Sequence, residues 1–197
     1  MTALDNVTVH LPHHPLPKPV TPPHLPGEVA ISRLDHFNGA PAADLQPALL
    51  SCLRSHHWAH RITAHRPYPD LDSLLAASDE AAYDLAPTDL TEALAGETLP
   101  TLPEDTYEAA HTALNAAYAA YEAKFGHVFV IHLCDTPAGE ALDRVLEAIR
   151  SRLANDPEEE RQIAAEQLRR LARDRLTRHL RGAENCATSH KQPAPDR

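Results

Sequence analysis

The sequence predicts an all-α protein, a single-domain helical bundle of about seven helices with one short extended segment. Apolar residues recur at three- and four-residue steps through most of residues 31–181, which is the period of a helix with one buried face. Only residues 128–133 form a β-branched, apolar run, and one isolated strand cannot make a sheet. A chain of 197 residues supports one hydrophobic core, so we expect one domain.

Both ends of the chain lack the composition of a packed core. Residues 1–30 are rich in proline and hold few large apolar residues, so we expect an extended, disordered tail. A solvated extension is the expected role, and a docking ligand for an aromatic groove is the alternative. Residues 182–197 are predicted to form a similar C-terminal tail, which leaves residues 31–181 as the helical domain.

The first half of this domain contains four short predicted helices. They are expected over residues 41–54, 56–65, 70–84 and 88–95, and the last begins at Thr88 after Pro87. A fifth helix carries a stripe of apolar and aromatic residues and ends at Gly126, because glycine commonly terminates helices. The members of this stripe are Ala110, Leu114, Ala117, Tyr118, Tyr121 and Phe125.

Two further helices are expected after the extended segment. Thr136 followed by Pro137 is a start signal, and an apolar stripe follows from Leu142 to Leu153. Asp156 provides a second start signal, for a long and charged final helix that reaches Leu180. We interpret its many arginines and glutamates as a solvated face with ion pairs one turn apart.

Composition narrows the range of partners. The formal net charge is −10 and the pI is about 5.7, which argues against general nucleic-acid binding because a phosphate backbone needs a basic face. No apolar run is long enough to span a membrane, and the N-terminus lacks the pattern of a signal peptide. We expect a cytoplasmic protein with a small-molecule substrate, a possible homodimer, and neither nucleic-acid nor membrane partners.

The cysteines and clustered histidines give weak metal signals. Three cysteines without CxxC spacing predict neither a disulfide framework nor a thiolate zinc site, and Cys134 beside Asp135 is expected to be a buried, inert thiol. His56 and His60 lie one helical turn apart, a spacing that can share a divalent ion, but no acidic residue lies among them. A His-rich surface helix is the favoured interpretation, and no metal or cofactor is expected.

Several segments together resemble one enzyme family. Residues 37–41 are Phe-Asn-Gly-Ala-Pro, residues 66–74 begin Arg-Pro-Tyr, and residues 121–131 begin Tyr-Glu-Ala-Lys-Phe-Gly. With Trp58-Ala59 and Arg152-Leu153-Ala154-Asn155, their order and spacing are similar to those of the OHCU decarboxylases, which act on 2-oxo-4-hydroxy-4-carboxy-5-ureidoimidazoline (OHCU). The resemblance covers residues 31–180. It implies a cofactor-free, all-helical and often dimeric enzyme that removes carbon dioxide from OHCU to give (S)-allantoin.

The resemblance also implies the site, and the sequence departs from it there. In the family a His-Pro-x-Ile-Gly motif follows an Ala-Gly pair, and its His is the general acid/base. Here Glu97 follows Ala95-Gly96 instead, and a carboxylate there would repel an anionic substrate unless it were protonated in a buried site. The family's Ser-x-x-Glu-Gln motif is absent, and Glu108 is the candidate replacement for its Glu.

Other residues complete the candidate site. His132 and His127 flank the extended segment and are candidate replacements for the acid/base, because imidazole exchanges protons near neutral pH. His127 is expected more often at a structural or solvent-facing place. By resemblance, the substrate-binding candidates are Phe125, Gly126, Phe129, Ile131 and Arg66, together with Glu108.

Three functions follow from this pattern. The first is OHCU decarboxylation in urate breakdown, with Glu97, His132 or His127 as catalytic residues. The second is a repurposed relative that carries out a cyclisation, dehydration or decarboxylation of another small molecule in specialised metabolism, because the chemistry resides in the site and not in the fold. The third is a catalytically dead binding protein that uses its Pro-rich tail or a dimer face.

Overall fold

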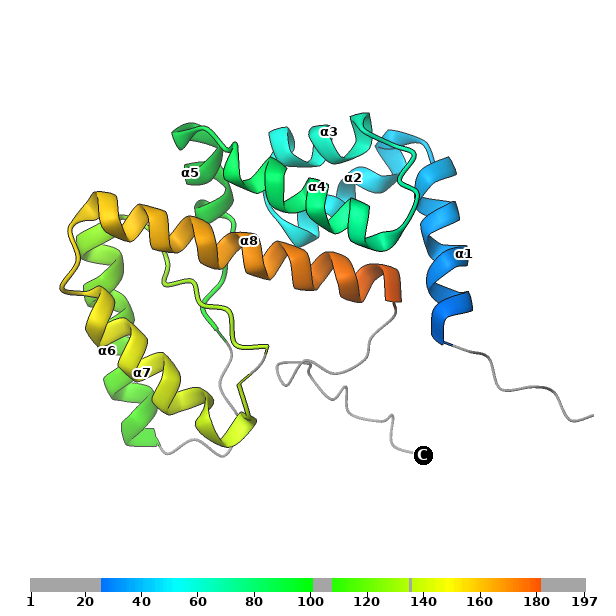
Figure 1. The fold of residues 1–197 in the computed structure, drawn as a ribbon. Coiled ribbons are helices and arrows are strands. Elements are labelled where there is room, and N and C mark those ends of the chain that lie inside the picture. Colours follow the sequence, from blue (N-terminus) through cyan, green and yellow to red (C-terminus); the bar gives the residue numbers. More distant parts are fainter. Residues whose placement is uncertain (1–25, 101–107, 135, 182–197) are drawn as a thin grey trace, which may run out of the picture.

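The computed structural model describes residues 26–100, 108–134 and 136–181, and within these ranges the chain is entirely helical with irregular connections and no strand. Helix α8 runs across the middle of the molecule, α1 to α5 lie on one side of it, and α6 and α7 lie near its N-terminal end (Figure 1). The helices are α1 (Pro26–Gly39), α2 (Ala42–Cys52), α3 (His56–Ala64), α4 (Leu71–Tyr83), α5 (Pro87–Ala95), α6 (Glu108–Phe125), α7 (Ala141–Arg152) and α8 (Pro157–Arg181), with a 3-10 turn, η1 (Ala138–Glu140).

The all-α prediction is confirmed, and the main difference is at the N-terminus. Helix α1 begins at Pro26, within the segment that the proline content assigned to a tail, and it continues to Gly39. It packs against α8, with Leu34 and Phe37 buried. The rest of the predicted tail, residues 1–25, lies outside the described residues, as do residues 182–197.

Side-chain caps fix the N-terminal ends of several of these helices. Ser55 Oγ accepts a hydrogen bond from the amide of Trp58, and Asp70 Oδ1 accepts one from the amide of Ser73. Asp156 Oδ1 accepts hydrogen bonds from the amides of Glu158 and Glu159, so the predicted start of the final helix is confirmed.

One predicted helix start is wrong. Thr136 does not cap α7, because the chain after Pro137 first forms η1, and α7 begins only at Ala141. Helix α5 begins one residue earlier than predicted, with Pro87 in its first turn. Among the described residues, no helix combines the length and apolar character that crossing a bilayer requires.

Two hydrophobic clusters form the interior. The larger joins α1 to α5 with one face of α8, and Trp58 at its centre is fully buried, with its indole nitrogen donating to the carbonyl of Ser78 at 3.1 Å. The smaller joins α6 and α7 through Leu114, Tyr121, Val145 and Ile149. The long helix α8 therefore supports the first cluster while its N-terminal part adjoins the second (Figure 1).

The extended segment after α6 connects these clusters. Val130 packs in the larger cluster, whereas its neighbour Phe129 packs in the smaller one, as alternating directions along extended chain allow. Arg152 fixes this segment by donating to the carbonyl of Val130 at 2.6 Å, and Arg152 is itself held by the buried carboxylate of Glu160. The predicted extended segment is thus present, anchored by a buried arginine rather than by a sheet.

Candidate functional site

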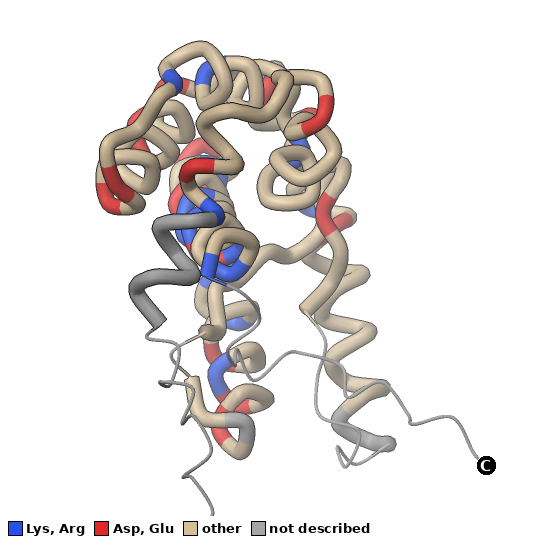
Figure 2. Tube along the Cα trace, turned by 90° about the vertical axis from the view of Figure 1, so that its right-hand side faces the viewer, with Lys and Arg blue, Asp and Glu red and all other residues tan. Residues whose placement is uncertain are grey.

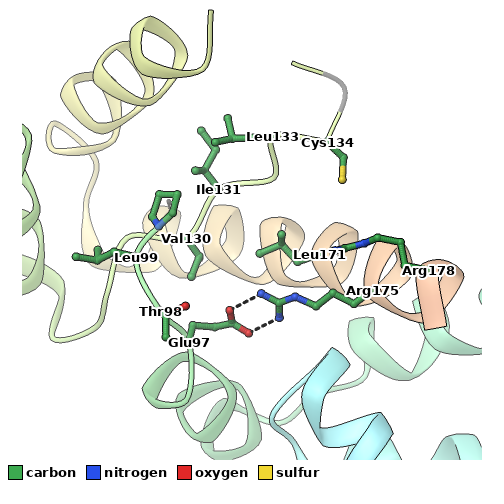
Figure 3. A pocket seen from close by; sticks show the side chains of 11 residues that line it. Glu97, Thr98, Leu99, Val130, Ile131, Leu133, Cys134, Leu171, Arg175 and Arg178 are labelled. Carbon is green, nitrogen blue, oxygen red and sulfur yellow. Dashed lines mark hydrogen bonds and ion pairs between the residues drawn. The ribbon is translucent and has the colours of Figure 1, made fainter. Parts of the chain in front are cut away.

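A cavity of about 230 Å³ lies where the chain leaving α5, the extended segment and the C-terminal half of α8 meet (Figure 3). We call it the α8 cavity. Its walls combine apolar and polar side chains, and its charged groups come from α8 and from the end of α5. The residues that line it are Glu97, Thr98, Leu99, Pro100, Val130, Ile131, Leu133, Cys134, Leu171, Arg175 and Arg178.

Glu97 enters this cavity bound to an arginine. Its two carboxylate oxygens accept hydrogen bonds from Arg175 Nη1 at 2.7 Å and Nη2 at 2.8 Å. This is a bidentate ion pair, and Figure 3 marks both of its hydrogen bonds. The Glu97 side chain is only 4% exposed. Burial alone would lower the pKa of Arg175, but the hydrogen bonds and charge of Glu97 outweigh it and raise that pKa. The charge of Glu97 is therefore balanced within the protein.

The residue before Glu97 fixes where this carboxylate emerges. Gly96 ends α5, and a Cβ placed there would lie 2.1 Å from Cδ and 2.8 Å from Cβ of Arg54. The Arg54 side chain occupies that space, so a larger residue at position 96 would displace it. The Ala-Gly pair identified in the sequence thus serves close packing at the end of α5.

Arg178 is the second guanidinium of the α8 cavity. It lies three residues after Arg175, hence on the same side of α8, together with Leu171 and Arg175. Its Nε is buried and has no hydrogen-bond partner among the described residues. A buried donor without a partner costs free energy, and it is a group that a ligand can satisfy.

His132 lies next to this cavity in a pair with α8. Its Nε2 hydrogen bonds to Asp174 Oδ2, and the backbone amide of His132 donates to Gln167 at 2.8 Å. Its neighbours Ile131 and Leu133 line the cavity. The imidazole is thereby oriented by a carboxylate, the arrangement that prepares a histidine for proton transfer.

Cys134 lies beside this pair. One ligand atom from each of His132, Cys134 and Asp174 lies within 4.8 Å of the others, a spacing that would suit a metal ion. However, Cys134 is half-buried and takes part in a disulfide, so it offers no thiolate. The sequence-based expectation of a buried, inert thiol is wrong for this residue, and it applies instead to Cys52, which is free and buried.

Three of the predicted site residues lie in a different cavity. Phe125, Gly126 and His127 line a hollow of about 210 Å³ against α5 and the start of α8, which we call the α5–α6 cavity. Gly126 adopts a φ of 77°, as expected of a glycine that ends a helix. His127 Nδ1 lies 3.0 Å from the carbonyl of Val128, and its ring packs edge-on against Tyr121. These residues are therefore separate from Glu97.

The remaining candidates occupy structural positions. Phe129 is fully buried between Tyr118 and Tyr121. Arg66 donates to the carbonyls of Phe37 at 2.8 Å and Ala40 at 2.6 Å, and so ties α1 to the loop before α4. Ile131 lines the α8 cavity. Glu108 begins α6, but its side chain lies outside the described residues.

Of the two histidines considered as metal ligands, His56 and His60, the first has polar side chains near both of its ring nitrogens. His56 Nδ1 lies 3.1 Å from Gln46 Nε2, and His56 Nε2 lies 3.8 Å from Glu92. His56 and His60 line a third hollow, on α2 and α3.

The sequence-based prediction missed the contribution of α8. Asp174, Arg175 and Arg178 were included in a solvated helix face, whereas the structure directs them to the α8 cavity and its neighbouring histidine. Their spacing with Leu171, at three, four and seven residues, is a signal that could have placed them on one face. Their partner Glu97 lies far away in the sequence.

Comparison with known proteins agrees with this architecture. The sequence matches the OHCU decarboxylase family over residues 38–102 and 99–177. The fold resembles the crystal structure of an OHCU decarboxylase in the presence of (S)-allantoin, with a TM-score of 0.57 and 21% identity over 66% of this chain and 94% of the other.

A second crystal structure, of an (S)-allantoin synthase, has a TM-score of 0.57 and 20% identity over 76% of this chain, which spans only 53% of that longer protein. No curated protein sequence matches. These likenesses concern the fold, whereas the family match covers most of the sequence that forms the helices and the α8 cavity. The chain belongs to the OHCU decarboxylase family.

Proposed function

We propose that this protein is a cofactor-free carbon-carbon lyase that decarboxylates a small carboxylate in the α8 cavity, with OHCU as substrate and (S)-allantoin as product. The observation that carries this proposal is that Glu97 lies in a cavity with two arginines and beside a His–Asp pair. By the resemblance of the sequence, we assign Glu97 to the position of the family's acid/base histidine. Family membership supports the reaction class.

The charges of the cavity suit this reaction. When the bond from the ring carbon to the carboxylate breaks, carbon dioxide leaves and the electron pair remains on the ring, so negative charge develops there. A guanidinium held in place by the protein stabilises such charge more strongly than water does, because it is already oriented. Arg178 is the available group, since Arg175 is already paired with Glu97.

The ring carbon must then receive a proton, and we assign this step to His132. A ring nitrogen of His132 lies within 4.8 Å of the sulfur of Cys134, which lines the cavity, and Asp174 orients the ring from α8. Glu97 is bound at both oxygens by Arg175, so we assign it an electrostatic and structural role rather than the proton transfer. His127 lies in the α5–α6 cavity and has no part in this scheme.

The test is turnover of freshly generated OHCU by the purified full-length chain, followed by circular dichroism as optically active allantoin forms. We expect faster formation than in buffer, retention in the control Arg181→Gln, and loss of the enzymatic rate in His132→Gln. A folded protein that forms allantoin no faster than buffer would refute the proposal.

The Glu97–Arg175 ion pair also favours a second candidate. A family member that has fixed one cavity arginine with its own carboxylate presents a different charge pattern to its substrate, as expected of an enzyme repurposed for another small carboxylate. The variant Glu97→His separates the two candidates. If it gains OHCU turnover that the natural protein lacks, the scaffold is competent and its present substrate is another molecule. If neither form turns over OHCU, a biosynthetic gene cluster around the gene would favour the repurposed enzyme over a dead binding protein.

A further inference from the structure

We infer that Arg178 is the anion-binding residue of the α8 cavity, and that the ligand it selects is a small molecule with a single carboxylate. This inference deepens the proposed function, on whose cavity it rests, but it concerns binding and does not require turnover. It follows from how the arginines of α8 are paired.

The other arginines on the inward and flanking sides of α8 have acidic partners. Arg169 and Arg173 bind Asp79 at 2.8 and 2.6 Å, and Arg169 also shares Glu166 with Arg170. Arg178 has no such carboxylate among the described residues, and its Nε is buried without a hydrogen-bond partner. Figure 2, viewed roughly along α8, shows basic residues gathered on this helix in a chain whose net charge is −10. Arg178 is thus a local cation that no carboxylate of the described residues neutralises, and a bound anion can supply the partner.

Arg175 cannot take that role in the natural protein. Its two terminal nitrogens are occupied by both oxygens of Glu97, and Nη1 also donates to the carbonyl of Cys52 at 3.1 Å. A ligand carboxylate would have to displace an internal one that is already oriented, at no gain in charge pairing. Figure 3 shows the Glu97–Arg175 pair linked and Arg178 without a link to the other residues drawn.

The same pair limits the ligand to one negative charge. Glu97 and Arg175 neutralise one another, so Arg178 leaves the cavity lining with one unbalanced positive charge. A second carboxylate would face Glu97 across a small space, where like charges repel. A volume of about 230 Å³ bounded by Val130, Ile131 and Leu171 suits a compact molecule.

The experiment follows the Nε–Hε signal of Arg178 in ¹⁵N-labelled full-length protein by NMR, with assignment from the Arg178→Lys spectrum. The probes are allantoate, which carries ureido groups and one carboxylate, and allantoin, which is neutral and similar in size. We expect allantoate to shift the Arg178 signal in a saturable manner and allantoin to have at least tenfold lower affinity, because a charge-assisted hydrogen bond is lost.

The variants then test the assignment. Arg178→Gln should weaken allantoate binding about tenfold or more, Arg178→Lys should retain part of it, and the exposed control Arg181→Gln should leave it unchanged. Unchanged affinity in a folded Arg178→Gln variant, or equal binding of allantoin and allantoate, would overturn the inference. Binding that depends on Arg178 in a protein without OHCU turnover would uphold this inference while refuting the proposed function.

Discussion

The carboxylate of Glu97 meets the guanidinium of Arg175 across two hydrogen bonds of 2.7 and 2.8 Å, although 78 residues separate them in the chain. This pair joins the end of α5 to the C-terminal half of α8. The sequence alone showed a carboxylate at this position without a partner, and the structure supplies the opposite charge from α8.

Glu97→Gln is predicted to destabilise the protein and to change its ligand preference. The amide cannot balance the charge of Arg175, so we expect a loss of about 2 kcal/mol in the free energy of unfolding. Freed from Glu97, Arg175 should also allow malonate, a dicarboxylate, to bind more tightly than it binds to the natural protein. Urea unfolding and malonate titration measure these effects, with Glu122→Gln, an exposed glutamate on α6, as control. Unfolding at the same urea concentration in all three proteins would contradict the prediction.

Glu160 is predicted to be among the least replaceable acidic residues of the described chain. Its side chain is fully buried, and it accepts hydrogen bonds from Tyr121, from Arg152 and, at 2.9 Å, from Asn155. Breaking a buried ion pair by removing one partner costs about 3–5 kcal/mol, so Glu160→Gln should lower the free energy of unfolding by that order. Its exposed neighbour Glu159 is a matched site, and Glu159→Gln should stay within about 0.5 kcal/mol of the natural protein.

The hydrogen bond from Arg169, opposed by partial burial and reinforced by Arg170, lowers the pKa of Glu166 to about 2 from 4.5. Because the folded-state pKa is depressed, the stability contributed by Glu166 is fully present above about pH 4.5 and is lost as the pH falls towards 2. Solvent screening keeps this contribution small. We therefore expect the difference in thermal midpoint between the natural protein and Glu166→Gln to shrink between pH 5 and pH 2.5. A difference that is constant over this range would contradict the ion-pair explanation.

Cys52 is predicted to be unreactive while the protein is folded. Burial, only partly offset by Arg175, raises the pKa of this thiol to about 11, so very little thiolate exists at pH 8. Iodoacetamide should leave Cys52 unmodified in native protein and alkylate it in urea, as peptide mass spectrometry can establish. Rapid alkylation without unfolding would show that the contact between α2 and α8 opens readily.

The pair of His132 with Asp174 is predicted to be required for efficient turnover. General acid catalysis contributes about 10²- to 10⁴-fold, so His132→Gln should lower kcat by this order with a smaller change in KM. Asp174→Asn should retain more activity than His132→Gln, because the imidazole stays in place and loses only its charged partner. His179→Gln, which changes an exposed histidine on α8, serves as the control. An equal loss in the His132 and His179 variants would show that the loss does not depend on the imidazole beside the cavity, and would contradict the prediction.

The sequence predicted the helices well because their signals are local. Apolar spacing, the cap at Asp156 and Gly126 at the end of α6 each act within a few residues, and the structure follows them. Helix α1 was missed because the prolines before it dominate the composition, whereas its burial against α8 is a tertiary effect.

The site was predicted less completely, since its residues meet only through folding. Glu97 was identified from its place after Ala95-Gly96, but its partner Arg175 resembled any arginine on a charged helix. His127 and His132 flank the same extended segment, five residues apart, yet they border different cavities. His127 follows the end of α6 and lines the α5–α6 cavity, whereas His132 lies against Asp174 of α8. Only the position of α8 distinguishes them.

Helix α8 both supports the larger hydrophobic cluster and lines the cavity with Leu171, Arg175 and Arg178. A molecule that binds these residues therefore holds the helix against which α1, α2 and α4 pack. Binding should then stabilise the whole bundle and raise its melting temperature. At a ligand concentration one hundred times the Kd, the free energy of unfolding should increase by about 2.7 kcal/mol. A thermal melt across a library of small carboxylates could thus find the natural ligand without any assay of its chemistry.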